Sequence, residues 1–333
     1  MQVGQLKRRE FVRLVVGAAA SWPVAVRAQQ PAMPVIGLLA VAPPEAIAIR
    51  LRAFREGLSM AGYVEGQNVN IEYRWAEAYT GRLPELAAHL VRDQVAVLVA
   101  AGGTASALAA KAATPSIPVV FGIAADPVDL GLVASINRPG GNVTGVISLN
   151  IEVVPKRLEL LHELLPSVTT VALLVNPAVP AIVEPVLRLS QLAARALGLQ
   201  LHVVHASSDR DFDAIFERLI QLNAGALVIA PDNLFTAHTK QLATLTVRHA
   251  LPAVYEFREF AAAGGLMSYG SSETEYFRLV GTYTGRILQG NRPADLPVQQ
   301  VTKVELFLNL KTAKALGITV PLPLSGRAEE IFE

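Results

Sequence analysis

The sequence predicts an α/β protein that consists of two doubly wound, Rossmann-like lobes with a ligand cleft between them. Three observations indicate this architecture. The chain has 333 residues, which is too long for one small domain and suits two lobes of about 150 residues each. Short apolar runs alternate with helical stretches, and the runs are continuous, as expected of strands buried on both faces of a parallel sheet. The same alternation then occurs a second time along the chain.

The first half of the chain predicts a complete doubly wound lobe. The predicted strands are Val35–Leu39, Val69–Arg74, Val95–Ala100, Val119–Ile123 and Val143–Ile147. The predicted helices are Ile49–Ala61, Leu83–Arg92, Thr104–Ala113 and a short one at Leu130–Ser135.

The second half repeats this rhythm. Helices are predicted over Pro155–Leu165, Ile182–Leu197, Phe212–Leu222 and Thr236–His249, and strands over Val171–Val175, Gln200–His205, Ala226–Ala230, Ala253–Phe257 and Gly265–Tyr269. A helix over Glu275–Gln289 and a segment at Val301–Leu308 follow, and we expect them to return to the first and second lobes respectively. Lobe 1 is therefore assigned residues 33–147 plus 271–292, and lobe 2 residues 148–270 plus 293–333.

Residues 1–28 have the pattern of an export signal. A basic start precedes the apolar run 14–26, and a small-residue cleavage site ends at Ala28. A membrane anchor is the alternative, but the run is interrupted by Pro23 and is shorter than the ~20 residues of a spanning helix. Arg8-Arg9 resembles a twin-arginine signal, so either export route is compatible with the sequence. We expect a periplasmic protein that is cleaved near Ala28.

Composition excludes several classes of function. The chain has 29 basic and 28 acidic residues and no basic stripe, so no nucleic-acid partner is expected. It contains no cysteine, which excludes disulfides, thiolate metal sites, a cysteine nucleophile and a lipid anchor on cysteine.

Catalytic motifs are also missing from the sequence. Leu266 stands where the first glycine of a Gly-x-Ser-x-Gly elbow around Ser268 would be required. No phosphate-binding glycine loop is present, and the nearest histidines, His202 and His205, point to opposite faces of a predicted strand. We therefore expect no enzyme, no cofactor and no metal.

Polar residues follow two predicted strands of lobe 1, at the sheet edge where ligands of α/β proteins bind. Gly103, Thr104 and Ser106 lead into a helix whose N-terminus suits a carboxylate, although Thr104 could equally be an ordinary helix cap. Asp126 follows the next strand and could accept from a ligand ammonium, with helix capping as the favoured alternative.

Lobe 2 has its own polar strand ends. Asn176 follows one predicted strand, and Asp232-Asn233 follow another. Asp232 is the favoured partner for a ligand ammonium, with a simple loop turn as the equally weighted alternative.

Two further strands of lobe 2 end near aromatic residues. Tyr255, Glu256 and Tyr269 would add aromatic walls and a second carboxylate, although aromatic rings belong to the core more often than to a site. A carboxylate-binding helix end, a carboxylate for an ammonium and aromatic walls together describe an amino-acid-like ligand.

Several segments resemble one family over nearly the whole chain: the solute-binding proteins of ABC importers with the type I periplasmic fold, in the subgroup that includes tryptophan-binding members. The segments that carry the resemblance are Phe54-Arg55-Glu56-Gly57-Leu58 with Ala61-Gly62-Tyr63, Asn137-Arg138-Pro139-Gly140-Gly141-Asn142-Val143-Thr144-Gly145-Val146, Gly264-Gly265-Leu266, Pro293-Ala294-Asp295-Leu296-Pro297 and Ala315-Leu316-Gly317-Ile318.

The resemblance implies that Thr104, Asp126 and Asp232-Asn233 occupy the cleft. The sequence departs from the tryptophan-binding members at 40–43 and at Tyr255-Glu256, so the resemblance implies the fold and the transport role rather than tryptophan as ligand.

The resulting interpretation is a periplasmic binding protein that closes on a small amino-acid-like solute, with aromatic amino acids among the candidates. It delivers this solute to an inner-membrane ABC permease with its cytoplasmic ATPase. The alternative is a periplasmic sensor that signals to a membrane receptor. The effector domain of a transcription regulator and an exported enzyme are disfavoured by the export signal and by the missing motifs.

Overall fold

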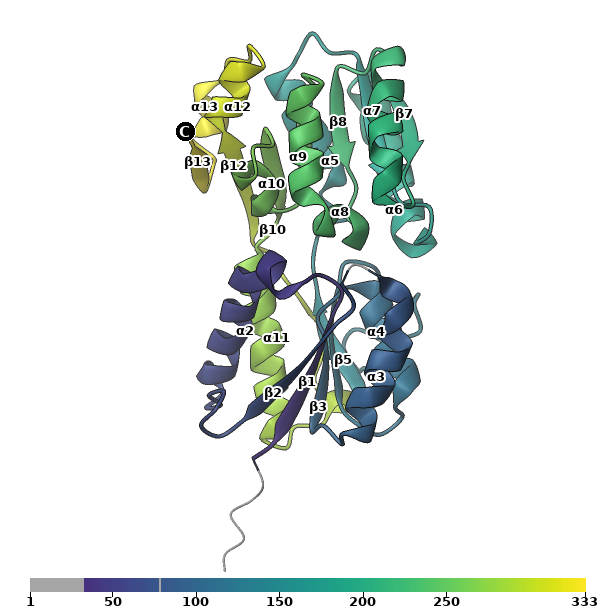
Figure 1. Cartoon of the computed structure of the whole chain (residues 1–333), viewed down its shortest axis with the longest axis vertical. Helices are drawn as coiled ribbons and strands as arrows, with labels where there is room; N and C mark the ends of the chain where they lie inside the picture. The colour runs from purple at the N-terminus through teal and green to yellow at the C-terminus, as the bar shows by residue number, and fades with distance from the viewer. Residues whose placement is uncertain (1–32, 78) are drawn as a thin grey trace, which may run out of the picture. The chain divides into compact units, whose positions relative to one another are not determined.

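The computed structural model describes residues 33–77 and 79–333, and residues 34–333 form one compact unit. The strands of this unit form two sheets (Figure 1). The predicted export signal, residues 1–28, lies outside the described residues. In the part of the chain that is described, no helix combines the length and the apolar character needed to cross a membrane.

The first sheet has the strand order β11-β5-β4-β3-β1-β2, and all neighbouring strands run parallel. Its strands are β1 (Val35–Ala40), β2 (Asn70–Trp75), β3 (Val97–Ala100), β4 (Val119–Ile123), β5 (Val143–Ile147) and β11 (Gln299–Gln300). The helices α2 (Ala48–Met60) and α11 (Glu273–Leu288) cover one face, and α3 (Leu83–Arg92) and α4 (Thr104–Ala113) cover the other. We call this sheet with its helices lobe 1.

The second sheet has the order β13-β12-β10-β9-β8-β6-β7 and is parallel except where β12 pairs with β10. Its strands are β6 (Thr170–Val175), β7 (Gln200–His205), β8 (Ala226–Ile229), β9 (Ala253–Tyr255), β10 (Met267–Ser271), β12 (Val304–Asn309) and β13 (Glu330–Phe332). We call this sheet with its helices lobe 2.

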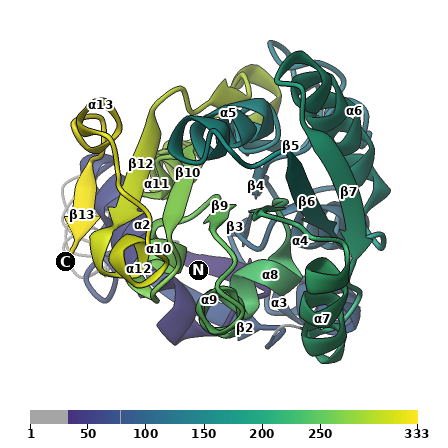
Figure 2. The same ribbon diagram turned by 90° about the horizontal axis from the view of Figure 1, so that it is seen from above.

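Helices cover both faces of the second sheet (Figure 2). One face carries α5 (Val154–Leu164) and α6 (Pro180–Ala196), and the other carries α7 (Phe212–Gln221), α8 (Asn233–Ala237), α9 (Thr239–Arg248) and α10 (Arg258–Ala262). The short helices α12 (Leu310–Ala315) and α13 (Leu322–Ser325) lie near the C-terminus. Strands buried between two helical layers explain why the apolar runs are continuous.

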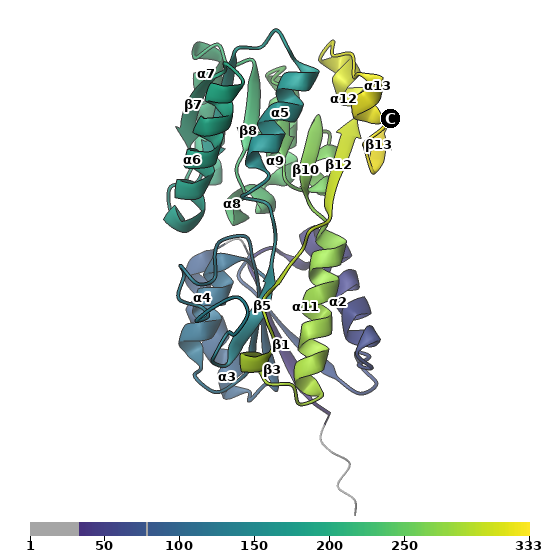
Figure 3. The same ribbon diagram turned by 180° about the vertical axis from the view of Figure 1, so that it is seen from behind.

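The chain passes between the two lobes from β5 to α5, from β10 to α11 and from β11 to β12 (Figure 3). The sequence places the last passage near residue 293, and this position is wrong. Strand β11 pairs with β5, and the Thr144 hydroxyl donates to the Leu296 carbonyl at 2.6 Å. Leu296 is buried on lobe 1, so residues 293–300 belong to lobe 1 although their Pro-rich composition suggests a linker.

Some predicted elements also differ from the structure. The short helix expected at Leu130–Ser135 is a series of turns, because Gly131 has a left-handed backbone (φ 65°) that a helix cannot continue through. The helix expected over Thr236–His249 is divided at His238 into α8 and α9. The strand expected over Ala253–Phe257 stops at Tyr255.

Both sheets share one topological feature that positions a site. In lobe 1 the chain order reverses between β1 and β3, and in lobe 2 it reverses between β6 and β8. Ligands of open parallel sheets bind at such a reversal, beyond the carboxyl ends of the strands. The residues that follow β1, β3, β6 and β8 are therefore expected to line a ligand site.

Candidate functional site

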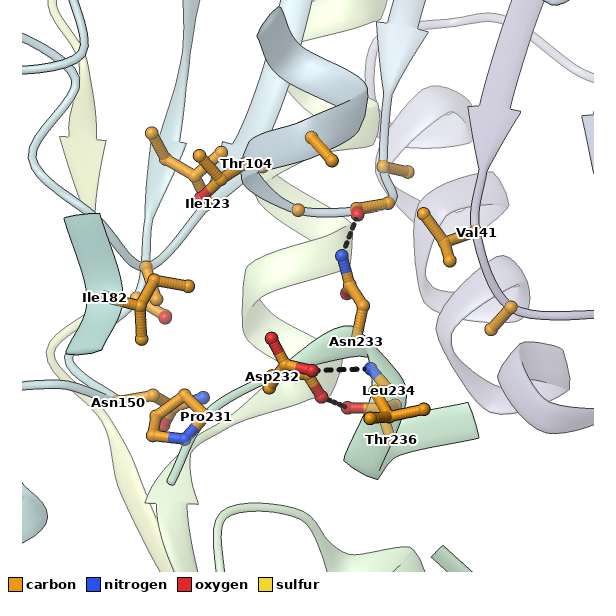
Figure 4. Close-up of a pocket in the computed structure, with 18 of the residues that line it drawn as sticks. Val41, Thr104, Ile123, Asn150, Ile182, Pro231, Asp232, Asn233, Leu234 and Thr236 are labelled. Atoms are coloured by element: carbon orange, nitrogen blue, oxygen red, sulfur yellow. Dashed lines mark hydrogen bonds between the residues drawn. The ribbon is translucent and has the colours of Figure 1, made fainter. Parts of the chain in front are cut away.

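A cavity of about 450 Å³ lies between the carboxyl ends of the two sheets. Its walls come from the segments after β1, β3, β4 and β5 of lobe 1 and after β6, β7, β8, β9 and β10 of lobe 2. Both topological reversals therefore open into the same space. Figure 4 shows its central part, with side chains of both lobes pointing inward.

The lobe 1 wall is formed by the turn from β3 into α4. Gly103 is the N-cap of α4 with φ 77°, and Thr104 is the first helical residue. The Thr104 hydroxyl is buried and has no hydrogen-bond partner among the described residues. A hydroxyl beside the positive end of a ten-residue helix can bind a carboxylate.

The lobe 2 wall opposite is formed by the start of α8. Asp232 caps this helix, and its Oδ1 accepts from the Leu234 amide at 2.7 Å and from Asn176 Nδ2 at 3.0 Å. Both bonds end on Oδ1, so the second oxygen can accept from a ligand. Burial raises the pKa of Asp232, and the hydrogen bond from Asn176 counteracts this. A cation would stabilise the charged form of this buried carboxylate.

Asn233 connects the two walls directly. Its Nδ2 donates to the Gly102 carbonyl of lobe 1 at 2.8 Å, as the dashed line in Figure 4 shows. A Cβ atom on Gly103 would come within 3.2 Å of the Asn233 amide, so this close approach suits glycine. The contact holds the two lobes together at the centre of the cavity.

The end of the cavity near the passages between the lobes is charged. Arg50 forms a salt bridge with Glu273, and its guanidinium carbon lies 4.4 Å from the centre of the Phe257 ring. Glu256 lines the same end and is 5% exposed. Burial raises the pKa of Glu256 to about 7, and the nearby Arg157 and Arg50 limit this rise.

The structure brings most of the predicted site residues to the cavity. They are Gly103, Thr104, Asn176, Asp232, Asn233 and Glu256. In the part of the chain that is described, no group of three or more histidine, aspartate or glutamate side chains could hold a metal ion.

Ser106 and Asp126 do not line this cavity, contrary to the prediction. Ser106 is two residues beyond Thr104 on α4 and therefore faces away from it, beneath Gly102. Asp126 is exposed and caps a turn, with its Oδ1 accepting from the Val128 amide at 2.7 Å. The capping alternative is right that the side chain caps the following segment, but that segment is a turn and not the predicted helix.

Tyr255 and Tyr269 are likewise outside the cavity. Tyr255 is fully buried, and its hydroxyl donates to the Asp232 carbonyl at 3.2 Å, so it supports the α8 turn from behind. The Tyr269 side chain packs on the lobe 2 core, and its carbonyl accepts from Arg157 Nε at 2.7 Å. Both tyrosines follow the common rule that aromatic rings in α/β lobes belong to the core.

Residues 36–332 match the model of the ABC transporter substrate binding protein family. The chain belongs to this family. The Tyrosine-binding protein of Clostridioides difficile (strain R20291) is 26% identical over 270 residues, which cover 80% of this chain and 76% of that relative.

Two solved structures have the same fold as this chain. A conserved domain protein from Vibrio cholerae is 26% identical with a TM-score of 0.82, and an ABC domain from Streptococcus pneumonia in complex with L-Trp is 23% identical with a TM-score of 0.82. Each covers 90% of this chain and 99% of its own. The predicted fold class, two doubly wound lobes of the type I periplasmic binding kind, and the predicted family are both confirmed.

This substrate-binding protein has cavity residues that strand ends alone do not indicate. Arg50 and Glu273 lie in the first turns of α2 and α11. The sequence contains a signal for Arg50, because it lies three and four residues before Ala53 and Phe54 on the buried face of α2, where a charged side chain is unusual. Two more cavity residues lie where the chain passes between the lobes: Asn150, after β5, and Ser271, the last residue of β10.

Proposed function

We propose that this protein is the periplasmic binding component of an ABC importer, which captures a small amino-acid-like solute between its lobes and delivers it to an inner-membrane permease driven by a cytoplasmic ATPase. The export signal at residues 1–28 and cleavage near Ala28 are part of this proposal. Membership of the ABC transporter substrate binding family supports it.

One observation carries the choice of ligand class. Thr104 at the N-terminus of α4 and Asp232 at the start of α8 face the same cavity from different lobes. The first group suits a carboxylate and the second suits an ammonium, so the pair matches the two charges of an α-amino acid. A ligand held from both lobes also stabilises their closed arrangement, which is the state that a permease would recognise.

The proposal is tested by calorimetry of the purified mature protein with the standard amino acids, preceded by mass spectrometry of small molecules released on denaturation. L-tyrosine and L-tryptophan are the first probes, because a relative is named a Tyrosine-binding protein and a structural neighbour holds L-Trp. We expect at least one amino acid to bind with a Kd in the micromolar range or below.

Asp232→Asn should weaken the binding of that amino acid about ten- to a hundredfold, because a charge-assisted contact is worth about 1.5–3 kcal/mol. Asp126→Asn is the matched control, since Asp126 lies outside the cavity and asparagine keeps the oxygen that caps its turn. Equal affinity of both variants and the unchanged protein would contradict the assignment of Asp232 to the ammonium.

A further inference from the structure

We propose that Glu256 determines the specificity of this protein by accepting a hydrogen bond from a neutral O–H or N–H group at the far end of an aromatic ligand side chain. This inference rests on the proposed function, because it takes the ligand to be an amino acid held by Asp232 and Thr104. The inference gives a role to Glu256, a cavity carboxylate that takes no part in the proposed contacts of Asp232 and Thr104 with the ligand.

The position of Glu256 follows from the order of the strands. It comes directly after β9, which pairs with β8, and Asp232 follows β8. Adjacent strands are about 4.8 Å apart, so Asp232 and Glu256 stand side by side on the lobe 2 wall. A ligand whose ammonium lies at Asp232 has its side chain within reach of Glu256 when it extends toward the passages between the lobes.

The aromatic residues of the cavity indicate that the side chain extends in this direction. Phe257 follows Glu256 directly in the chain and lines the cavity, and Tyr276, which is close enough to Glu256 for their charges to interact, lines it as well. Aromatic walls favour an aromatic ligand ring through offset or edge-to-face contacts.

Glu256 can accept a hydrogen bond from a ligand, because no salt bridge in the described part of the chain occupies its carboxylate. Three carboxylates line it, those of Asp232, Glu256 and Glu273, and Glu273 is engaged by Arg50. Among the described residues no salt bridge reaches Glu256, although it is 5% exposed. Each donor near a carboxylate that is buried to this degree stabilises its charged form, and a ligand group can add one to those of Tyr255 and the two nearby arginines. Its pKa of about 7, raised by burial, is consistent with this need.

A neutral donor fits this place better than a second cation. Arg157 and Arg50 both lie close enough to Glu256 to favour its charged form. Arg157 is fully buried, and its Nε is bound to the Tyr269 carbonyl. A ligand ammonium or guanidinium would be repelled by these two guanidinium groups, whereas a phenol hydroxyl or an indole N–H would not.

The test compares L-tyrosine with L-phenylalanine, which differ by one hydroxyl, in calorimetry with the purified protein at pH 8. We expect tyrosine to bind at least about tenfold more tightly. In Glu256→Met, which keeps the length of the side chain and removes the acceptor, the two ligands should bind within about threefold of each other.

Glu256→Gln serves as a second variant should the methionine variant not fold, and it should reduce the preference for tyrosine severalfold because the acceptor loses its charge. Glu259→Gln is the matched control, since Glu259 is also near Arg50 but does not line the cavity, and it should keep the full preference.

Equal affinity of the unchanged protein for tyrosine and phenylalanine would overturn the role of Glu256 and leave the proposed function intact. The role of Glu256 would also be overturned if the Glu256 variants kept the full preference for tyrosine over phenylalanine, or if L-lysine bound more tightly than L-tyrosine. If none of the standard amino acids binds, the proposed function fails and this inference fails with it.

Discussion

At the scale of single residues, Thr104 shows how a binding group differs from a structural one. Buried hydroxyls normally have a hydrogen-bond partner, and the Thr104 hydroxyl has none among the described residues. Thr114 on the same lobe is equally buried, but its hydroxyl accepts from the amides of Ser116 and Ile117 at 3.2 and 3.0 Å. The first arrangement is costly unless a ligand completes it.

Thr104→Val should therefore leave the free energy of unfolding of the ligand-free protein unchanged or raise it by up to about 1 kcal/mol, while it weakens amino-acid binding about tenfold. Thr114→Val should do the opposite, lowering the free energy of unfolding by about 1–3 kcal/mol without changing affinity, because two amides lose their acceptor. Urea unfolding and calorimetry measure both quantities. A destabilised Thr104→Val with normal affinity would show that Thr104 is only the start of a helix.

The same contrast explains which site residues the sequence could predict. Asp232 and Thr104 were predictable because polar residues after parallel strands lie at the edge where ligands bind. Tyr255 and Tyr269 satisfy that rule as well, but the rule gives a position along the chain and not the direction of a side chain. The rule does not identify Arg50 as a cavity residue, because Arg50 lies on helix α2 and not at the end of a strand. It reaches the cavity only through the packing of α2 on α11.

At the scale of secondary-structure elements, the packing of α2 against α11 is unusually close. A Cβ atom on Gly281 of α11 would collide with the Phe54 carbonyl of α2, and one on Gly57 of α2 would collide with the Arg278 carbonyl of α11. The two helices therefore touch through their backbones. This contact fixes the first turns of both helices, which carry Arg50 and Glu273 into the cavity.

Gly281→Ala should lower the free energy of unfolding by about 1–3 kcal/mol, because the helices would have to move apart. The sign of this change in the free energy of unfolding is informative, since alanine in place of glycine normally stabilises an exposed helix by about 1 kcal/mol. Gly141→Ala is the control, as nothing lies within 4 Å of a Cβ atom there, and it should change the free energy by less than about 0.5 kcal/mol. Chemical denaturation distinguishes these outcomes, and a stabilised Gly281→Ala would contradict the close packing.

The elements that the sequence predicts well are those with long apolar periodicity. Strand β6 and helix α5 begin and end within two residues of their predicted bounds, because the buried side chains of β6 are continuous and those of α5 recur at helical spacing. Strand β11 was not predicted, since two exposed glutamines at a sheet edge have no pattern of their own. Its existence depends on pairing with β5, which is a tertiary contact rather than a local preference.

At the scale of the whole molecule, the three passages between the lobes are bound to one another. The Leu149 amide donates to Ser271 Oγ at 2.7 Å, the Ser271 amide donates to Asn150 Oδ1 at 2.8 Å, and the Ser272 amide donates to the Lys303 carbonyl at 2.9 Å. These bonds join segments that are far apart in the sequence. We therefore expect the three passages to act as one hinge, about which the lobes open and close around the cavity.

The closed arrangement of this hinge is favoured by the bond from Asn233 to the Gly102 carbonyl, which crosses the cavity at 2.8 Å. Asn233→Ala removes that bond and keeps Asp232 and Thr104 in place. A hydrogen bond is worth about 1 kcal/mol, so the ratio of closed to open molecules should fall about fivefold and the affinity for the cognate amino acid should fall by up to the same factor. Small-angle scattering should show a larger radius of gyration for the ligand-free variant than for the ligand-free unchanged protein, and saturating ligand should reduce both to the same value.

Asn291→Ala is the matched control, because Asn291 Nδ2 donates to the Arg286 carbonyl at the same 2.8 Å but within lobe 1. If both variants gave the radius and the affinity of the unchanged protein, the bond across the cavity would not contribute to closure.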